Sequence, residues 1–171
     1  MKTNINKILF TTDLSSNSRY AFNYAASIAG HYGASIVILH VMENIPQGAE
    51  ALISGFLGED KMNELAKANE QNARSALIGK KSESMMIRQA LDALSQDTVV
   101  GRDEGVVTDE IIVTKGDVAE EIINQANDCD MIIMAYRSRN MLADTIVGDH
   151  TRRVLRRSKK PVLLVPMPDE K

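Results

Sequence analysis

The sequence predicts a single α/β domain built on a doubly wound parallel sheet. Short apolar runs alternate with segments of helical period, which is the pattern of repeated β-α units joined by right-handed crossovers. The runs are continuously apolar rather than alternating, as expected for strands buried on both faces. The length of 171 residues, 44% of them hydrophobic and 25% charged, suits one globular domain with a sizeable core.

The first half of the chain opens with a strand, a helix and a second strand. "KILFTT" (7–12) is a short apolar run closed by "DLSSNS", where serine or asparagine is expected to cap a helix. Apolar residues recur at helical spacing over 19–32, and Gly30 and Gly33 mark the stop. "ASIVILHVM" (34–42) is rich in β-branched residues and predicts a buried strand.

The second half continues the alternation after a less regular stretch. Residues 44–58 predict a loop that can include a short helical turn. Residues 59–94 are mostly helix formers with a break or a kink near Gly79, and 95–110 are polar and rich in turn residues. The remaining expected elements are a strand at 110–116, a helix capped by Asp117 and running to 128, a strand at 131–136, a helix at 142–157 and a strand at 161–166.

Composition excludes several classes of protein. The net charge of −3, from 20 basic and 23 acidic residues, lacks the basic excess of a nucleic-acid binder. No apolar run approaches the ~20 residues of a membrane span. The single cysteine, Cys129, lies beside an apolar run, where it is expected to pack as a small hydrophobe. A chain with one cysteine fits a reducing compartment, so we expect a cytoplasmic location.

Five blocks, in this order and spacing, resemble the universal stress protein family: "KILFTTDLS", "ASIVILHV", "VTKGDVAEEII", "DMIIMAY" and "GDHTRRVLRRSKKPVLLVP". The resemblance covers most of the chain, and the departures lie at about 44–84 and 96–108. We therefore expect residues 1–171 to form one such domain, with a helical or loop insertion around 44–84. The resemblance implies a five-stranded parallel sheet of order 3-2-1-4-5, an adenine-nucleotide alpha-hydrolase-like fold.

The same resemblance implies homodimers in which the last strands of two subunits pair. That strand contains Val162, Leu163, Leu164 and Val165. An apolar edge strand without a guarding charge is a liability unless something covers it. A second subunit is one cover, and the C-terminal tail is the alternative.

The family's ATP-binding branch carries a glycine motif after the fourth strand, and this sequence departs from it. Ala135 and Ser138 occupy the first two glycine positions, Gly148 the third, and Asp149 the position of the following hydroxyl. Glycines there allow backbone N–H groups to approach phosphates. A carboxylate ~5 Å from a phosphate charge costs about 3 kcal/mol at an effective dielectric of 20, which weakens binding roughly a hundredfold or more. Opposing this, Arg137 and Arg139 supply cations in the same loop, and Mg²⁺ between Asp149 and a phosphate would reverse the sign.

The adenine half of the motif is better preserved. Asp13 matches the residue that meets the base in the nucleotide-binding branch, and Val41 matches a backbone position at the end of the second strand. A helix N-cap explains Asp13 equally well. The nucleotide site that the resemblance implies, for ATP or AMP with Mg²⁺, comprises Thr11, Thr12, Asp13, Val41, Met134, Ala135, Arg137, Ser138, Arg139, Gly148, Asp149, His150 and Thr151.

Other chemistry is weakly supported. The three histidines lie far apart with no cysteine or carboxylate at metal-ligand spacing, so no metal site is expected. His40 is expected to be buried and hydrogen-bonded, while His150 is either a partly buried helix residue or a ligand contact. The basic run "RRVLRRSKK" is read as a solvated face, with an acidic partner or phosphate as the sharper alternative.

We therefore expect a non-catalytic stress-response protein, a homodimer with weak or absent ATP binding. The first alternative is an adenine-nucleotide-binding switch with slow or no hydrolysis. The second is a protein-partner-binding module acting through residues 44–95.

Overall fold

The structure, a computed structural model, describes residues 4–42, 55, 56, 58, 83–100, 108–136 and 148–166. These residues form five strands and four helices. In chain order they are β1 (Lys7–Thr12), α1 (Ser16–Tyr32), β2 (Ser35–Met42), α4 (Glu83–Val100), β3 (Thr108–Lys115), α5 (Val118–Ala126), β4 (Met131–Tyr136), α6 (Asp149–Arg157) and β5 (Val162–Pro166).

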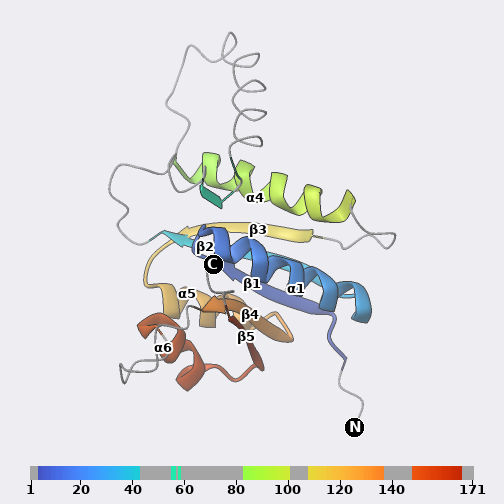
Figure 1. The fold of residues 1–171 in the computed structure, drawn as a ribbon. Helices are drawn as coiled ribbons and strands as arrows, with labels where there is room; N and C mark the ends of the chain where they lie inside the picture. The colour runs from blue at the N-terminus through green and yellow to red at the C-terminus, as the bar shows by residue number, and fades with distance from the viewer. Residues whose placement is uncertain are drawn as a thin grey trace.

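The strands form one parallel sheet of order β3-β2-β1-β4-β5 (Figure 1). This confirms the fold class and the strand order that the sequence predicts. β1 lies at the centre, paired with β2 on one side and β4 on the other. The connection direction reverses between β1 and β4, and open α/β sheets bind ligands at the carboxyl ends of such a pair.

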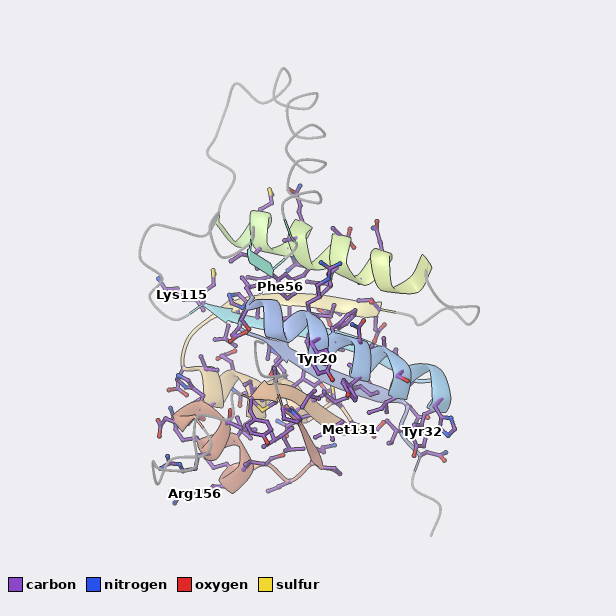
Figure 2. All side chains as sticks on the ribbon, in the orientation of Figure 1. Tyr20, Tyr32, Phe56, Lys115, Met131 and Arg156 are labelled. Atoms are coloured by element: carbon purple, nitrogen blue, oxygen red, sulfur yellow. The ribbon has the colours of Figure 1, made fainter. Side chains whose placement is uncertain are left out.

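Two apolar clusters cover the two faces of the sheet. On one face, α1 and α4 pack over the strands through residues such as Phe22 and Leu91, and Phe56 joins the same cluster (Figure 2). On the other face, α5 and α6 pack through Ile122 and Val154. Figure 1 shows α4 on the opposite side of the strands from α5 and α6. The sheet is therefore a middle layer, as strands that are apolar on both faces require.

Several helix and strand ends differ from those that the sequence predicts. β3 begins at Thr108 rather than 110, because its pairing with β2 extends the strand into polar residues, and α5 ends at Ala126 rather than 128. The expected helix over 142–157 is wrong at Gly148, whose ψ of 155° is not helical, so that α6 begins at Asp149.

α1 runs through Gly30 and ends at Gly33, whose φ of 66° lies in the left-handed region that glycine adopts without steric cost. α1 begins at Ser16, three residues before the expected 19. The prediction of polar, turn-rich chain over 95–100 is wrong, because α4 continues to Val100. Ser95 satisfies its hydroxyl by donating to the Asp92 carbonyl within the helix, at 2.9 Å.

Several expectations lie outside the described residues. They are the loop over most of 44–58, the helical stretch and its break over 59–82, and the part of the expected last helix at 142–147. In the part of the chain that the structure describes, no helix is long and apolar enough to cross a membrane.

Candidate functional site

A cavity of about 340 Å³ opens at the carboxyl ends of β1, β2 and β4, beside the first turns of α5 and α6. This is the position at which the sheet reverses direction, and the volume lies within the usual range of small-molecule sites. The residues that line it are Thr11, Thr12, Asp13, Ser18, Leu39, His40, Val41, Val118, Ile122, Met134, Ala135, His150 and Thr151.

Eight of the sequence-predicted site residues meet in this cavity. They are Thr11, Thr12, Asp13, Val41, Met134, Ala135, His150 and Thr151. Gly148 and Asp149 lie next to it at the start of α6 but do not line it. Arg137, Ser138 and Arg139 lie outside the described residues.

The Asp13 carboxylate is held in place by the loop between β1 and α1. Its Oδ1 accepts hydrogen bonds from the Ser15 N–H at 2.9 Å and from the hydroxyls of Ser15 at 2.6 Å and Ser18 at 2.5 Å. Partial desolvation raises the pKa of Asp13, but these hydrogen bonds together outweigh it and hold the pKa below its usual value. The carboxylate is therefore ionised and fixed in orientation at neutral pH.

The N-cap alternative for Asp13 is wrong in detail. Ser15, in extended conformation at φ −76° and ψ 156°, occupies the N-cap position of α1. Asp13 stands two residues earlier and orders that cap from outside the helix. Its second oxygen, Oδ2, makes no hydrogen bond with any residue that the structure describes. Asp13 thus lines the cavity with one acceptor oxygen uncommitted to the described chain.

The turn between Asp13 and Ser15 is held in an uncommon backbone conformation. Leu14 has φ 60°, in the left-handed region that a leucine rarely adopts, and its side chain is buried. Its N–H donates to Thr12 Oγ1 at 3.0 Å. A buried side chain and a hydroxyl therefore hold the chain where a glycine is more usual, and such local strain is common beside functional sites.

His40 lies in the wall of the cavity and is buried, as predicted. Its Nδ1 lies 2.9 Å from the Thr12 carbonyl, which fixes Nδ1 as the protonated nitrogen because a carbonyl only accepts. The bond links the ends of β1 and β2. Sequence reasoning treated His40 as structural and missed it as a lining residue.

Four further lining residues escaped the sequence analysis: Ser18, Leu39, Val118 and Ile122. The position of Ser18 and Val118 in the first turn of a helix was a usable signal, since helix starts and the carboxyl ends of strands converge on one edge of a parallel sheet. Leu39 lies three residues before the end of β2 and Ile122 in the second turn of α5, and no such signal marks them.

The third family glycine, Gly148, is the N-cap of α6 with φ −55° and ψ 155°. This conformation is open to any residue, and a Cβ at Gly148 would meet nothing within 4 Å. The backbone conformation therefore does not require glycine at this position. What glycine provides here is the open space left by the absence of a side chain before the first turn of α6. Asp149 follows at the first helical residue and its side chain is exposed.

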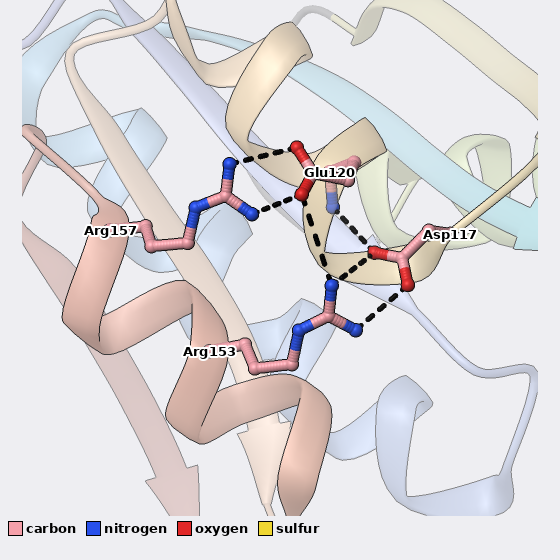
Figure 3. Close-up of polar contacts among 4 residues, drawn as sticks. All are labelled: Asp117, Glu120, Arg153 and Arg157. Atoms are coloured by element: carbon pink, nitrogen blue, oxygen red, sulfur yellow. Dashed lines mark hydrogen bonds and ion pairs between the residues drawn. The ribbon is translucent and has the colours of Figure 1, made fainter.

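A cluster of ion pairs joins α5 to α6 beside the cavity (Figure 3). Arg153 donates Nη1 to Asp117 Oδ2 at 2.8 Å and Nη2 to Asp117 Oδ1 at 2.9 Å. Arg157 donates to both carboxylate oxygens of Glu120, and Arg153 Nη2 lies 3.9 Å from Glu120 Oε1. Two arginines of the basic run are therefore engaged within the chain, whereas Arg152 and Arg156 are exposed.

Asp117 also caps α5, as the sequence predicted, because its Oδ1 accepts from the Glu120 N–H at 3.0 Å. Hydrogen bonding from Arg153, followed by that from the Glu120 backbone, lowers the pKa of Asp117 to about 2. One carboxylate thus serves both the helix cap and the ion pair.

The apolar strand β5 lies at the end of the sheet, next to β4. Val162, Leu163 and Leu164 are half-buried and Val165 is buried.

Cys129 is buried as expected, with its Sγ 3.7 Å from the Gln125 carbonyl, and burial raises the pKa of its thiol. Among the described residues, no group of three or more histidine, cysteine or acidic side chains is arranged to hold a metal ion.

Comparison with known proteins agrees with this geometry. The model of the universal stress protein family matches residues 4–166. The chain belongs to the universal stress protein family. It is 27% identical over 162 residues to universal stress protein MJ0577 of Methanocaldococcus jannaschii, with 93% of each chain covered.

Solved structures share the fold. Universal stress protein UspA from Lactobacillus plantarum superposes with a TM-score of 0.59 at 18% identity, covering 96% of this chain and 99% of that one. A universal stress protein in complex with cAMP superposes with a TM-score of 0.53 at 20% identity, covering 96% and 99%. That relative binds a cyclic adenine nucleotide.

Proposed function

We propose that this universal stress protein is non-catalytic, that it binds the base and ribose of an adenine nucleotide, and that it holds the phosphates weakly. The observation that carries the proposal is the fixed Asp13 carboxylate in the cavity wall. Its Oδ1 is saturated by Ser15 and Ser18, which leaves Oδ2 to accept from a ligand.

The chemistry of the cavity suits the uncharged half of a nucleotide. Adenine presents an amino group that a carboxylate oxygen can accept from, and a flat apolar ring that aliphatic side chains can cover. Val41, Val118 and Met134 supply aliphatic surface around the same cavity. The threonines of β1 line the same cavity, and the Thr12 hydroxyl, which accepts from the Leu14 N–H, still has its proton to donate to the ribose.

The phosphate end is less favourable. The N-terminal end of α6 lies beside the cavity, and the dipole of a helix attracts anions to that end. Asp149 places a negative charge at the same turn and opposes this attraction. Arg153, one turn later, is held by both oxygens of Asp117 and is not available without breaking that pair. The residues present therefore fit adenosine better than a triphosphate.

Absence of catalysis is part of the proposal. Asp13 is the one carboxylate among the described lining residues, and its position suits the base rather than a terminal phosphate. ATP would then be a ligand and not a substrate. Release of inorganic phosphate from ATP above the buffer rate would contradict this assignment.

Calorimetry of the full chain with adenosine, AMP, cAMP and ATP, with and without Mg²⁺, tests the binding. We expect each phosphate to add little, so that the four ligands bind within about tenfold of each other. Tight ATP binding, with a Kd below about 10 μM or about −7 kcal/mol, would instead favour the nucleotide-dependent switch. No measurable binding of adenosine at millimolar concentration would refute the proposal.

We further propose that the protein is a homodimer through β5. An apolar edge strand needs a cover, and pairing with a second β5 would complete its hydrogen bonds. Residues 167–171, the alternative cover, lie outside the described part of the chain.

A further inference from the structure

The ion pairs between α5 and α6 form two arginine–carboxylate forks, which a longer contact of 3.9 Å from Arg153 Nη2 to Glu120 Oε1 connects. Asp117 and Arg153 form the proximal pair, and Glu120 and Arg157 form the distal pair one helical turn farther along α6 (Figure 3). The two pairs use the same chemistry, an arginine fork on both oxygens of a carboxylate. Their surroundings differ.

The proximal pair joins two walls of the cavity. On α5, Asp117 immediately precedes Val118, which lines the cavity. On α6, Arg153 follows His150 and Thr151, which line the same cavity from the facing helix. The distal pair does not share this position, because Arg157 borders a separate, smaller hollow of about 140 Å³ at the other ends of these helices.

Asp117 fixes the proximal pair relative to the first turn of α5. Its Oδ1 is bonded both to the Glu120 N–H that it caps and to Arg153 Nη2. The guanidinium is planar and bonded at two points, so α6 is restrained against rotation relative to the first turn of α5 as well as against separation.

From this geometry we propose that Asp117 and Arg153 are positioning residues, which hold the first turn of α6 against the cavity and so raise its affinity for the ligand, whereas Glu120 and Arg157 stabilise the helix pair only. The inference rests on the proposed nucleotide function. The inference adds that affinity for the ligand depends on an ion pair that does not touch the ligand and whose two residues are 36 positions apart in the sequence.

Two matched pairs of variants separate positioning from general stabilisation. Arg153→Met and Arg157→Met each remove one positive charge from α6 and keep the aliphatic stem. Asp117→Asn and Glu120→Gln each neutralise one carboxylate, and asparagine remains a good N-cap for α5. Arg153→Lys keeps a cation that reaches Asp117 through a single point.

Two measurements are made on every variant of the full chain. Calorimetry gives the affinity for adenosine, whose lack of charge keeps the charge changes of the variants out of the comparison, and amide hydrogen exchange of the ligand-free protein reports protection at Arg152 to Val154. The Arg152 N–H donates to the Gly148 carbonyl at 2.9 Å, the first bond of α6, so its exchange reports whether that turn is held.

We expect Arg153→Met and Asp117→Asn to weaken adenosine binding about three- to fivefold and to speed exchange at the start of α6, with partial recovery in Arg153→Lys. Arg157→Met and Glu120→Gln should change adenosine affinity by less than about twofold at a similar loss of thermal stability. Equal effects of the proximal and distal variants on adenosine affinity, or unchanged exchange in Arg153→Met, would overturn the inference.

The wild-type chain distinguishes the two failures. If it binds neither AMP nor adenosine, the proposed function is refuted and the affinity part of the inference falls with it. Exchange at Arg152 to Val154 then still decides whether Asp117 and Arg153 restrain α6.

Discussion

Replacing Asp149 with serine isolates the electrostatic cost that this residue imposes on a bound phosphate. Serine restores the hydroxyl that the ATP-binding branch of the family carries at this position and keeps a residue that suits the first turn of a helix. The backbone conformation of Gly148 and Asp149 is ordinary, so the substitution requires no rearrangement. We expect ATP binding in the absence of Mg²⁺ to become about fourfold tighter.

The magnitude follows from the exposure of Asp149. At ~5 Å, two unit charges repel by about 3 kcal/mol at a dielectric of 20, but by only about 0.8 kcal/mol in water. The side chain is exposed, so the value in water is the better guide. A factor of about four therefore replaces the hundredfold penalty that sequence alone indicates.

Calorimetry with ATP, AMP and adenosine in EDTA provides the assay and its internal control. Adenosine carries no charge, so its affinity should be equal for the wild-type chain and Asp149→Ser. An equal gain for adenosine would show that the substitution acts on shape rather than charge. A gain of a hundredfold for ATP would show that Asp149 is far less solvated in the complex than its exposure indicates. If Mg²⁺ bridges Asp149 and a phosphate, addition of Mg²⁺ should favour the wild-type chain instead.

Three further predictions concern stability and assembly. Phe22→Ala should lower the free energy of unfolding by about 3–5 kcal/mol in urea titrations, because the ring is buried 5.1 Å from that of Phe10; a loss below about 1 kcal/mol would mean that the site collapses around the gap. The depressed pKa of Asp117, about 2 against 3.8 for a free aspartate, contributes stability that is present above about pH 4 and is lost as the pH falls towards 2. Urea midpoints measured between pH 5 and pH 2 should therefore fall more steeply for the wild-type chain than for Asp117→Asn, and parallel curves would contradict the assignment. Leu164→Lys on β5 should convert the proposed dimer to a monomer in sedimentation velocity; Leu164 also packs against the apolar cluster beneath α5 and α6, so circular dichroism must show that the fold is kept. Leu155→Lys, on an exposed leucine of α6, is the control that should leave the mass unaltered.

The sheet could be predicted from the sequence because its determinants are local. Each of β1, β2 and β4 is a continuous apolar run, and the residues in that run pack on both faces of the sheet. The cap at Asp117 and the stop at Gly33 also act within one turn of the chain. The extension of α4 to Val100 was missed because the polar residues from Ser95 onward have a composition typical of turns. Composition does not show hydrogen bonds inside a helix, such as that from the Ser95 hydroxyl to the Asp92 carbonyl.

The site was predicted only in part, because its geometry depends on residues that are far apart in the sequence. The eight predicted residues that meet in the cavity lie at strand and helix ends, which the fold alone brings together. The orientation of Asp13 could not be predicted, since an aspartate before a helix is typical of an N-cap. The backbone conformation places the cap at Ser15, and three hydrogen bonds to Oδ1 fix the Asp13 carboxylate outside the helix. The pairing of Arg153 with Asp117 depends on how two helices cross, which no pattern in either helix encodes.

The charged side chains around the cavity determine how strongly an anion can bind there. Asp13 is ionised and faces the cavity, and Asp149 stands at its rim. Arg153, the cation one turn beyond Asp149, is already committed to Asp117. A phosphate must therefore displace an existing pair, recruit Arg137 or Arg139, or arrive with Mg²⁺ as its own counter-charge. In the proposed binding mode the base and ribose meet the same hydrogen-bonding groups in every case, so the ligands differ only in what their phosphates meet. The affinity of adenosine relative to ATP is accordingly the quantity that best reports how this site works.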